Sequence, residues 1–161
     1  PMQINSSYDE LVQPHKLTPH PKNPNMHPQE QIKRLSEILD YQGQRSPIVV
    51  DKESGFVVVG HGRLAAAKLL GAEKVAVNYQ TFKDSAMLYA HMVADNSIGE
   101  WSTLDLVTIN MDFVEHGPDL NVDMLGLKNF SIEPIEVLDA EIPEQKPKAE
   151  KRCPKCNEVI G

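Results

Sequence analysis

Short apolar runs and helically spaced apolar residues follow one another along this chain, which predicts a succession of strands and helices. The first helical stretch begins at Pro28, a residue suited to the first turn of a helix, and ends before Gly43. Its apolar face is formed by Ile32, Leu35, Ile38 and Leu39. The prolines between residues 14 and 28 exclude a regular helix, so we expect an extended segment there.

Three short apolar runs predict strands, at residues 48–50, 56–59 and 75–79. A turn at residues 51–55 joins the first two runs. Between the second and the third, the alanine-rich run at residues 64–70 predicts a helix that ends at Gly71. This order of elements indicates a mixed α and β domain.

Helical spacing returns after Asp84 and continues to Asn96, before Gly99 interrupts it. Ser102 is the expected cap of a further helix, and residues 121–127 predict a last short one. A small helical part therefore follows the strands.

The composition changes at residue 129, where Glu, Pro and Lys predominate and aromatic residues are few. Such a segment buries too little apolar area to offset the entropy of the chain. We therefore expect a folded domain at residues 1–128 and a flexible tail at residues 129–161.

Composition and charge exclude some classes of function. The chain has 161 residues, 40% of them hydrophobic and 24% charged, which is typical of a soluble globular protein. No apolar run approaches the ~18–20 residues of a membrane span, and the first residues do not resemble a signal peptide, so we expect a cytoplasmic protein. A net charge of −7 argues against a broad electrostatic surface for DNA but is compatible with a local basic groove.

The junction between residues 56–59 and the alanine-rich helix carries the strongest chemical signal. It consists of Gly60, His61, Gly62 and Arg63. A strand that enters a helix through glycines leaves backbone N–H groups free at the helix start, where the dipole favours an anion. Arg63 adds a guanidinium suited to phosphate. The alternative is a tight turn with a solvated Arg63, and these residues alone do not decide between the two.

Three other clusters each have two interpretations. The proline-rich stretch around Asn23 is either a loop at the edge of a ligand-binding site or an ordinary surface loop. Asp95 and Asn96 either supply oxygen ligands for Mg²⁺ shared with phosphate or form the solvated end of a helix. Cys153 and Cys156 either form one knuckle of a zinc site, which needs further ligands, or are free thiols in the tail.

Taken in order, these motifs resemble the boxes of the ParB/sulfiredoxin superfamily, in particular the amino-terminal ParB-like (ParB-like nuclease) domain of the phage and mobile-element type. Residues 17–24 are similar to the first box, residues 60–71 to the second and residues 94–96 to the third. The resemblance covers about residues 11–127. It implies an α+β fold with a small mixed sheet and packed helices, then a short helical part and a disordered carboxy-terminal tail.

The resemblance implies a nucleotide pocket of the CTP or ATP type. By position, the residues that match the phosphate-binding box are Gly60, His61, Gly62 and Arg63. Asn23 lies in the loop that closes over the ligand, Asp95 matches the side that holds Mg²⁺, and Asn96 matches the phosphate side. Asp95 and His61 are then the candidate catalytic residues. The second box has fewer cations than that of partition ParB, which leaves hydrolysis of a nucleotide open. It has no cysteine beside it, and this absence disfavours sulfinic-acid reduction.

Two functions follow from the resemblance. The first is a nucleotide-binding domain, with or without hydrolysis, that serves DNA metabolism or regulation in a phage or mobile element. The second is a non-catalytic adaptor that binds DNA or a DNA-modification or packaging protein, with a homodimer as a candidate assembly. A metal-dependent nuclease that uses Asp95 and His61 is a third alternative.

Overall fold

The computed structural model describes residues 1–116 and 121–127. The β-sheet is built from β1 (Glu10–Val12), β2 (Thr18–Pro19), β3 (Ile48–Asp51), β4 (Phe56–Val59) and β5 (Val75–Gln80). The α-helices of the described ranges are α1 (Gln29–Gln42), α2 (His61–Leu70), α3 (Ser85–Ser97) and α4 (Leu106–His116). Short 3-10 helices lie at η1 (Pro14–Lys16), η2 (Ile98–Trp101) and η4 (Val122–Leu125).

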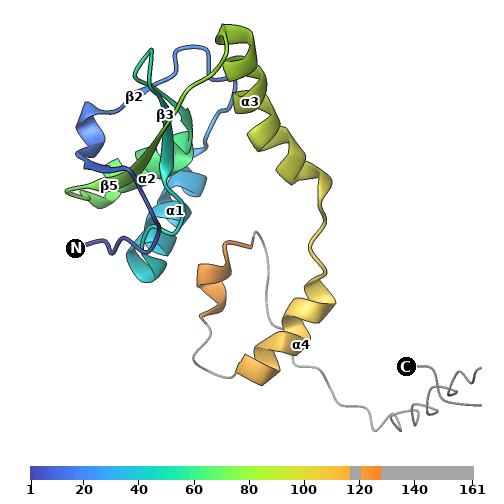
Figure 1. Ribbon diagram of the computed structural model, residues 1–161. Coiled ribbons are helices and arrows are strands. Elements are labelled where there is room, and N and C mark those ends of the chain that lie inside the picture. Colours follow the sequence, from blue (N-terminus) through green and yellow to red (C-terminus); the bar gives the residue numbers. More distant parts are fainter. Residues whose placement is uncertain (117–120, 128–161) are drawn as a thin grey trace, which may run out of the picture. The chain divides into compact units, whose positions relative to one another are not determined.

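The sheet is mixed, with its strands in the order β1-β5-β3-β4-β2 (Figure 1). β3 pairs antiparallel with β4, to which a turn joins it, and parallel with β5, which the chain reaches through α2. β1 and β2 form the two edges, antiparallel to β5 and parallel to β4 respectively. The strands predicted at residues 48–50, 56–59 and 75–79 are confirmed, whereas β1 and β2 are additions that the apolar pattern did not predict.

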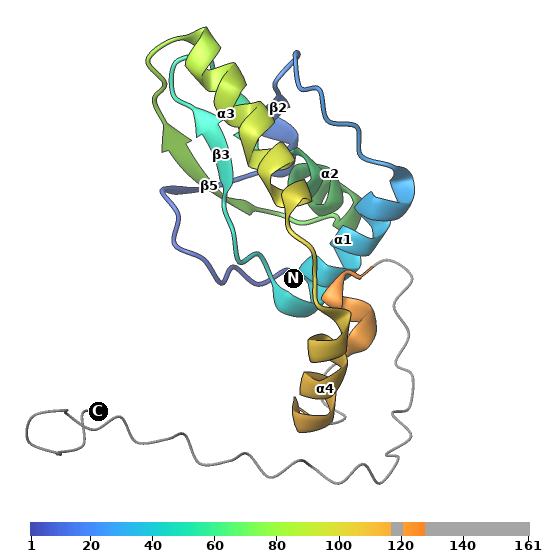
Figure 2. The ribbon, with the colours of Figure 1, turned by 90° about the vertical axis from the view of Figure 1, so that its right-hand side faces the viewer.

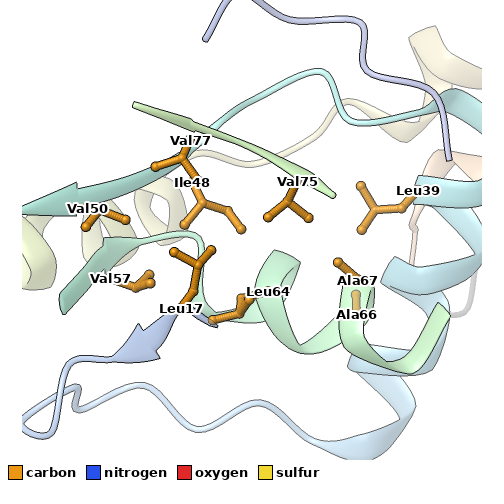
Figure 3. Close-up of a cluster of buried hydrophobic side chains, with 10 residues drawn as sticks. All are labelled: Leu17, Leu39, Ile48, Val50, Val57, Leu64, Ala66, Ala67, Val75 and Val77. Atoms are coloured by element: carbon orange, nitrogen blue, oxygen red, sulfur yellow. The ribbon is translucent and has the colours of Figure 1, made fainter. Parts of the chain in front are cut away.

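The larger hydrophobic cluster lies between one face of the sheet and the helices α1 and α2, as Figure 3 shows. Its buried residues are Leu17, Leu39, Ile48, Val50, Val57, Leu64, Ala66, Ala67, Val75 and Val77. The two helices pack against each other (Figure 2). α1 ends as predicted, because Gly43 has a φ of 73° that other residues rarely adopt.

The opposite face of β4 is covered by α3. Successive side chains of a strand point to opposite faces, so Val57 enters the larger cluster and Val58 a second one. Val58 is fully buried there against Leu88 and Met92 of α3. The same strand that leads into α2 therefore also anchors α3.

Gln44 is a polar residue with only 1% of its surface exposed. Its side-chain Nε2 donates to the carbonyls of Ala76 (3.0 Å) and Ser46 (3.1 Å), and its Oε1 accepts from the Ala76 N–H (2.7 Å). Its backbone N–H donates to the Gln3 carbonyl, and its carbonyl accepts from the Asn5 N–H, both at 2.8 Å. Gln44 therefore connects the amino-terminal segment to β5.

The helix expected after Gly99 is present, but Ser102 does not cap it. Asp105 Oδ1 accepts hydrogen bonds from the N–H groups of Val107 (3.0 Å) and Thr108 (3.2 Å), which makes Asp105 the cap of α4. Ser102 instead donates to the Gly99 carbonyl at 3.0 Å. The prediction was wrong because Asp105, three residues further on, offers a carboxylate directly at the start of the helix.

All described residues belong to one compact unit of the chain. In this part of the chain, no helix combines the length and the apolar character that crossing a bilayer requires. The tail expected at residues 129–161 lies outside the described residues, and so do Cys153 and Cys156. The boundary at residue 128 and the zinc knuckle therefore stay predictions.

Candidate functional site

The candidate site is built around the first turn of α2. Gly60 caps this helix with a φ of 95° and a ψ of 27°, a left-handed conformation that glycine adopts without strain. Its carbonyl accepts from the Leu64 N–H at 2.9 Å, which begins the helical pattern. No side chain caps the first turn, so the positive end of the helix dipole is left for another group. The strand–glycine–helix junction predicted from the sequence is confirmed.

Arg63 folds back against this turn. Its Nη2 donates to the Pro47 carbonyl at 3.3 Å, and a Cβ on Gly60 would lie only 3.1 Å from the same nitrogen. The Arg63 Nε is buried and has no hydrogen-bond partner. Burial lowers the pKa of Arg63, and the negative charge of Asp95 opposes this shift. A buried guanidinium donor without an acceptor is costly, and an anion at this point would satisfy it.

His61, the first residue of α2, is held by two partners. Its Nε2 accepts a hydrogen bond from the His20 backbone N–H at 3.3 Å. The backbone of Val57, in the strand that leads into α2, also lies close enough to act on this ring. Burial lowers the pKa of His61, and the neighbouring His27 and His20 lower it further. The geometry thus favours a neutral hydrogen-bonding role for His61 over that of a cation on phosphate.

This lowered pKa predicts how the stability of the protein depends on pH. In the unfolded chain His61 titrates near ~6.5, whereas the folded protein binds the proton less readily. Protons therefore favour the unfolded state, and the free energy of unfolding should fall as the pH drops from about 6.5 through the lower folded pKa, then level off. Urea titrations across this range test the prediction. His61→Gln, which does not titrate, should flatten the profile, while replacing the exposed His15 by Gln should leave it unchanged.

Two further histidines surround the first turn of α2, and the sequence did not single them out. The His27 ring packs on Gly62, where a Cβ would lie 3.2 Å from its Cε1, and its Nδ1 is 3.1 Å from Gln31 Oε1. The His20 ring meets the Phe56 ring edge-on, with 5.6 Å between centroids. Gly62 is therefore needed for the close approach of His27. The sequence did contain one feature that could have pointed to them, because both histidines lie in the proline-rich stretch around Asn23.

Asn23 organises its own loop. Its Oδ1 accepts from the Asn25 N–H at 3.2 Å, and its backbone N–H donates to the His20 carbonyl at 3.1 Å. These bonds give the loop a fixed local shape, as Asx turns do. A contact between Asn23 and a ligand stays a prediction.

Asp95 and Asn96 lie on the last turns of α3. Asp95 is exposed and attracts Arg63 electrostatically, without a direct ion pair between these two described residues. The Asn96 Nδ2 donates to the Met92 carbonyl at 2.7 Å, within the same helix. The structure thus brings Asp95 towards Arg63 and engages the amide of Asn96 in its own helix. No group of three His, Cys, Asp or Glu in the described ranges is arranged to hold a metal ion.

Comparisons with known sequences point to one family. The family described as ParB N-terminal domain matches residues 3–96 of the chain. The ParB-like nuclease domain-containing protein YnaK of Escherichia coli (strain K12) is 36% identical over 62 residues, which are 38% of this chain and 70% of that protein.

The chain is also similar to solved structures. The C-terminally truncated chromosome-partitioning protein ParB from Caulobacter crescentus, complexed with CTP-γ-S, matches with a TM-score of 0.55 at 19% identity. The match covers 64% of this chain and 59% of that one. Sulfiredoxin from Arabidopsis thaliana matches with a TM-score of 0.43 at 19% identity, over 52% of this chain and 94% of that one. The α+β fold of the ParB protein is therefore the fold of this chain.

Proposed function

The chain belongs to the ParB N-terminal domain family, and we propose that its site at the start of α2 binds the phosphates of a nucleotide of the CTP or ATP type. The observation that carries the proposal is the buried Arg63 Nε without a partner, beside a helix start that no side chain caps. An anion placed there would accept from a guanidinium and from backbone N–H groups together.

The relatives support a nucleotide over other anions. The ParB protein from Caulobacter crescentus that shares this fold was solved with CTP-γ-S. Because the likeness to that protein is one of fold, the chemical argument for this chain depends on its own Arg63 and on the first turn of α2. The binding experiment below compares nucleotides with three different bases. Hydrolysis of the bound nucleotide is a separate question.

Mg²⁺ fits this site as an ion shared with phosphate. It is usually held by one or two carboxylates together with phosphate oxygens and water, and Asp95 is the carboxylate that lies towards Arg63. When bound, the ion would neutralise part of the phosphate charge. The negative charge of Asp95 also acts on Arg63, since it opposes the lowering of the Arg63 pKa by burial.

Titration calorimetry of the full chain with CTP, ATP and GTP, each with MgCl₂, tests the proposal. We expect at least one nucleotide to bind at micromolar concentrations. Tripolyphosphate with MgCl₂ is the control that separates recognition of phosphate from recognition of a base. The absence of heat and of any shift in thermal unfolding with all four compounds would contradict the proposal.

A further inference from the structure

The segment that runs from η2 into α4, yellow in Figure 1, exposes large apolar side chains to solvent. Trp101 of η2 is 81% exposed and Val107 of α4 is 66% exposed. The other large apolar side chains of this segment that are about half exposed or more are Ile98, Leu104, Leu106 and Met111. Single exposed apolar residues are ordinary, whereas a group of them close together marks an interaction surface.

The same part of the chain is acidic throughout. Residues 84–127 of the sequence contain no Lys and no Arg. Glu100, Asp105 and Asp112 are exposed, and within the described ranges none of these carboxylates forms an ion pair. Their negative charge is therefore not balanced by neighbouring cations of the segment and is available to a partner.

On α4 the apolar and the acidic positions lie next to each other. Val107 and Met111 are four residues apart and share one stripe of the helix, and Asp112 lies on the stripe beside it. All three side chains are exposed, while Ile109 and Asn110 are partly buried. The helix thus presents an apolar stripe with a carboxylate at its border.

We propose that residues 98–112, the docking segment, bind a basic amphipathic helix of a partner protein. The apolar face of that helix covers Trp101, Val107 and Met111, and its Lys or Arg side chains meet Glu100 and Asp112. Tryptophan is among the residues that contribute most when they are buried at the centre of an interface. Opposite charges around such a centre steer the encounter and fix the orientation of the partner.

The charge of the docking segment disfavours other occupants. Nucleic acids and anionic membrane surfaces are bound through Lys and Arg, which residues 84–127 lack. The docking segment of a second copy, related by a twofold axis, would place carboxylates against carboxylates. A basic amphipathic helix matches both the apolar side chains and the charge.

The fluorescence of the chain reports on the docking segment directly, because Trp101 is the single tryptophan of the sequence. The probe is a synthetic helical peptide with leucine on one face and lysine on the other, titrated into the full chain without nucleotide. We expect a blue shift of the Trp101 emission that saturates at micromolar peptide and binding that weakens as salt is added. Peptides with glutamate in place of lysine, or serine in place of leucine, should bind at least about tenfold more weakly.

Removal of the apolar stripe tests whether the peptide docks on α4. The double variant Val107→Ser with Met111→Ser should bind the leucine–lysine peptide at least about tenfold more weakly, because both side chains are exposed and contribute to docking. Circular dichroism establishes that the helices are intact. Unchanged binding in this variant would overturn the proposal.

Charge reversal tests the acidic border. Glu100→Lys with Asp112→Lys should also weaken binding by at least about tenfold, since it turns attraction into repulsion. Glu53→Lys with Glu73→Lys is the matched control, because both residues are exposed acids outside the docking segment. An equal loss in the two double variants would reduce the effect to net charge and overturn the proposal.

Sedimentation velocity of the full chain without peptide tests the alternative occupant. We expect a monomer in which the docking segment is free. A dimer that Val107→Ser with Met111→Ser dissociates would show that a second copy covers the segment, and it would overturn the proposal of a basic partner. None of these measurements uses a nucleotide, so their outcome is independent of the proposed function.

Discussion

Replacing Arg63 by alanine is expected to lower the affinity for nucleotide by at least about 100-fold, because hydrogen bonds to charged groups contribute about 1.5–3 kcal/mol each and a guanidinium offers several. The structure makes Arg63 the charged donor that lies against the uncapped first turn of α2. Its Nη2 is engaged with Pro47, while its Nε is left for the ligand. Titration calorimetry with the nucleotide that binds the wild type measures the loss.

Arg63→Lys distinguishes charge from geometry. Lysine keeps the charge but lacks the planar set of donors, so it should restore only part of the affinity. Arg45→Ala is the matched control, because Arg45 is exposed and its removal changes the net charge equally. Wild-type affinity in Arg63→Ala, or an equal loss in Arg45→Ala, would contradict a specific role for Arg63. Unfolding curves of each variant establish that the domain is intact.

The parts of the fold that the sequence predicted are those that neighbouring residues determine. The strand at residues 56–59, the turn at Gly60 and the helix that ends at Gly71 depend on apolar runs and on glycines that allow positive φ, 95° at Gly60 and 71° at Gly71. β1 and β2 were not predictable in this way. They are three and two residues long, and β1 is defined by its pairing with β5, far along the chain.

In the candidate site, too, features that neighbouring residues determine were predicted, and features that distant residues determine were not. The first turn of α2 was predicted, because Gly60 and Arg63 lie in one short segment. The acceptor of Arg63 is the backbone carbonyl of Pro47, which has no signature in side-chain chemistry. The histidines that surround His61 come from the proline-rich stretch before α1, and only tertiary structure brings them close to His61. This is also why the sequence alone did not show that the His61 ring accepts from the His20 N–H.

Replacing Gln44 by methionine should destabilise the domain by about 1–3 kcal/mol, because leaving the buried Ala76 N–H unpaired costs about that much. Methionine has a similar length and fills the same space, but it cannot bond to the backbone of Ala76. The Ala76 N–H would then lose its partner in a buried place, and the Ala76 carbonyl would lose one hydrogen bond. Urea unfolding followed by circular dichroism measures the change.

Gln80→Met is the control for this substitution, because Gln80 is an exposed residue of the same strand, β5. It should change the free energy of unfolding by less than about 0.5 kcal/mol, as is usual for surface positions. Hydrogen exchange adds a local readout, since the Ala76 amide should lose protection in Gln44→Met before the central amides of β3 do. If Gln44→Met were as stable as Gln80→Met, a mobile water or a backbone shift would have to satisfy Ala76. Gln44 would then be a filler of space and not the connection between β5 and the amino-terminal segment.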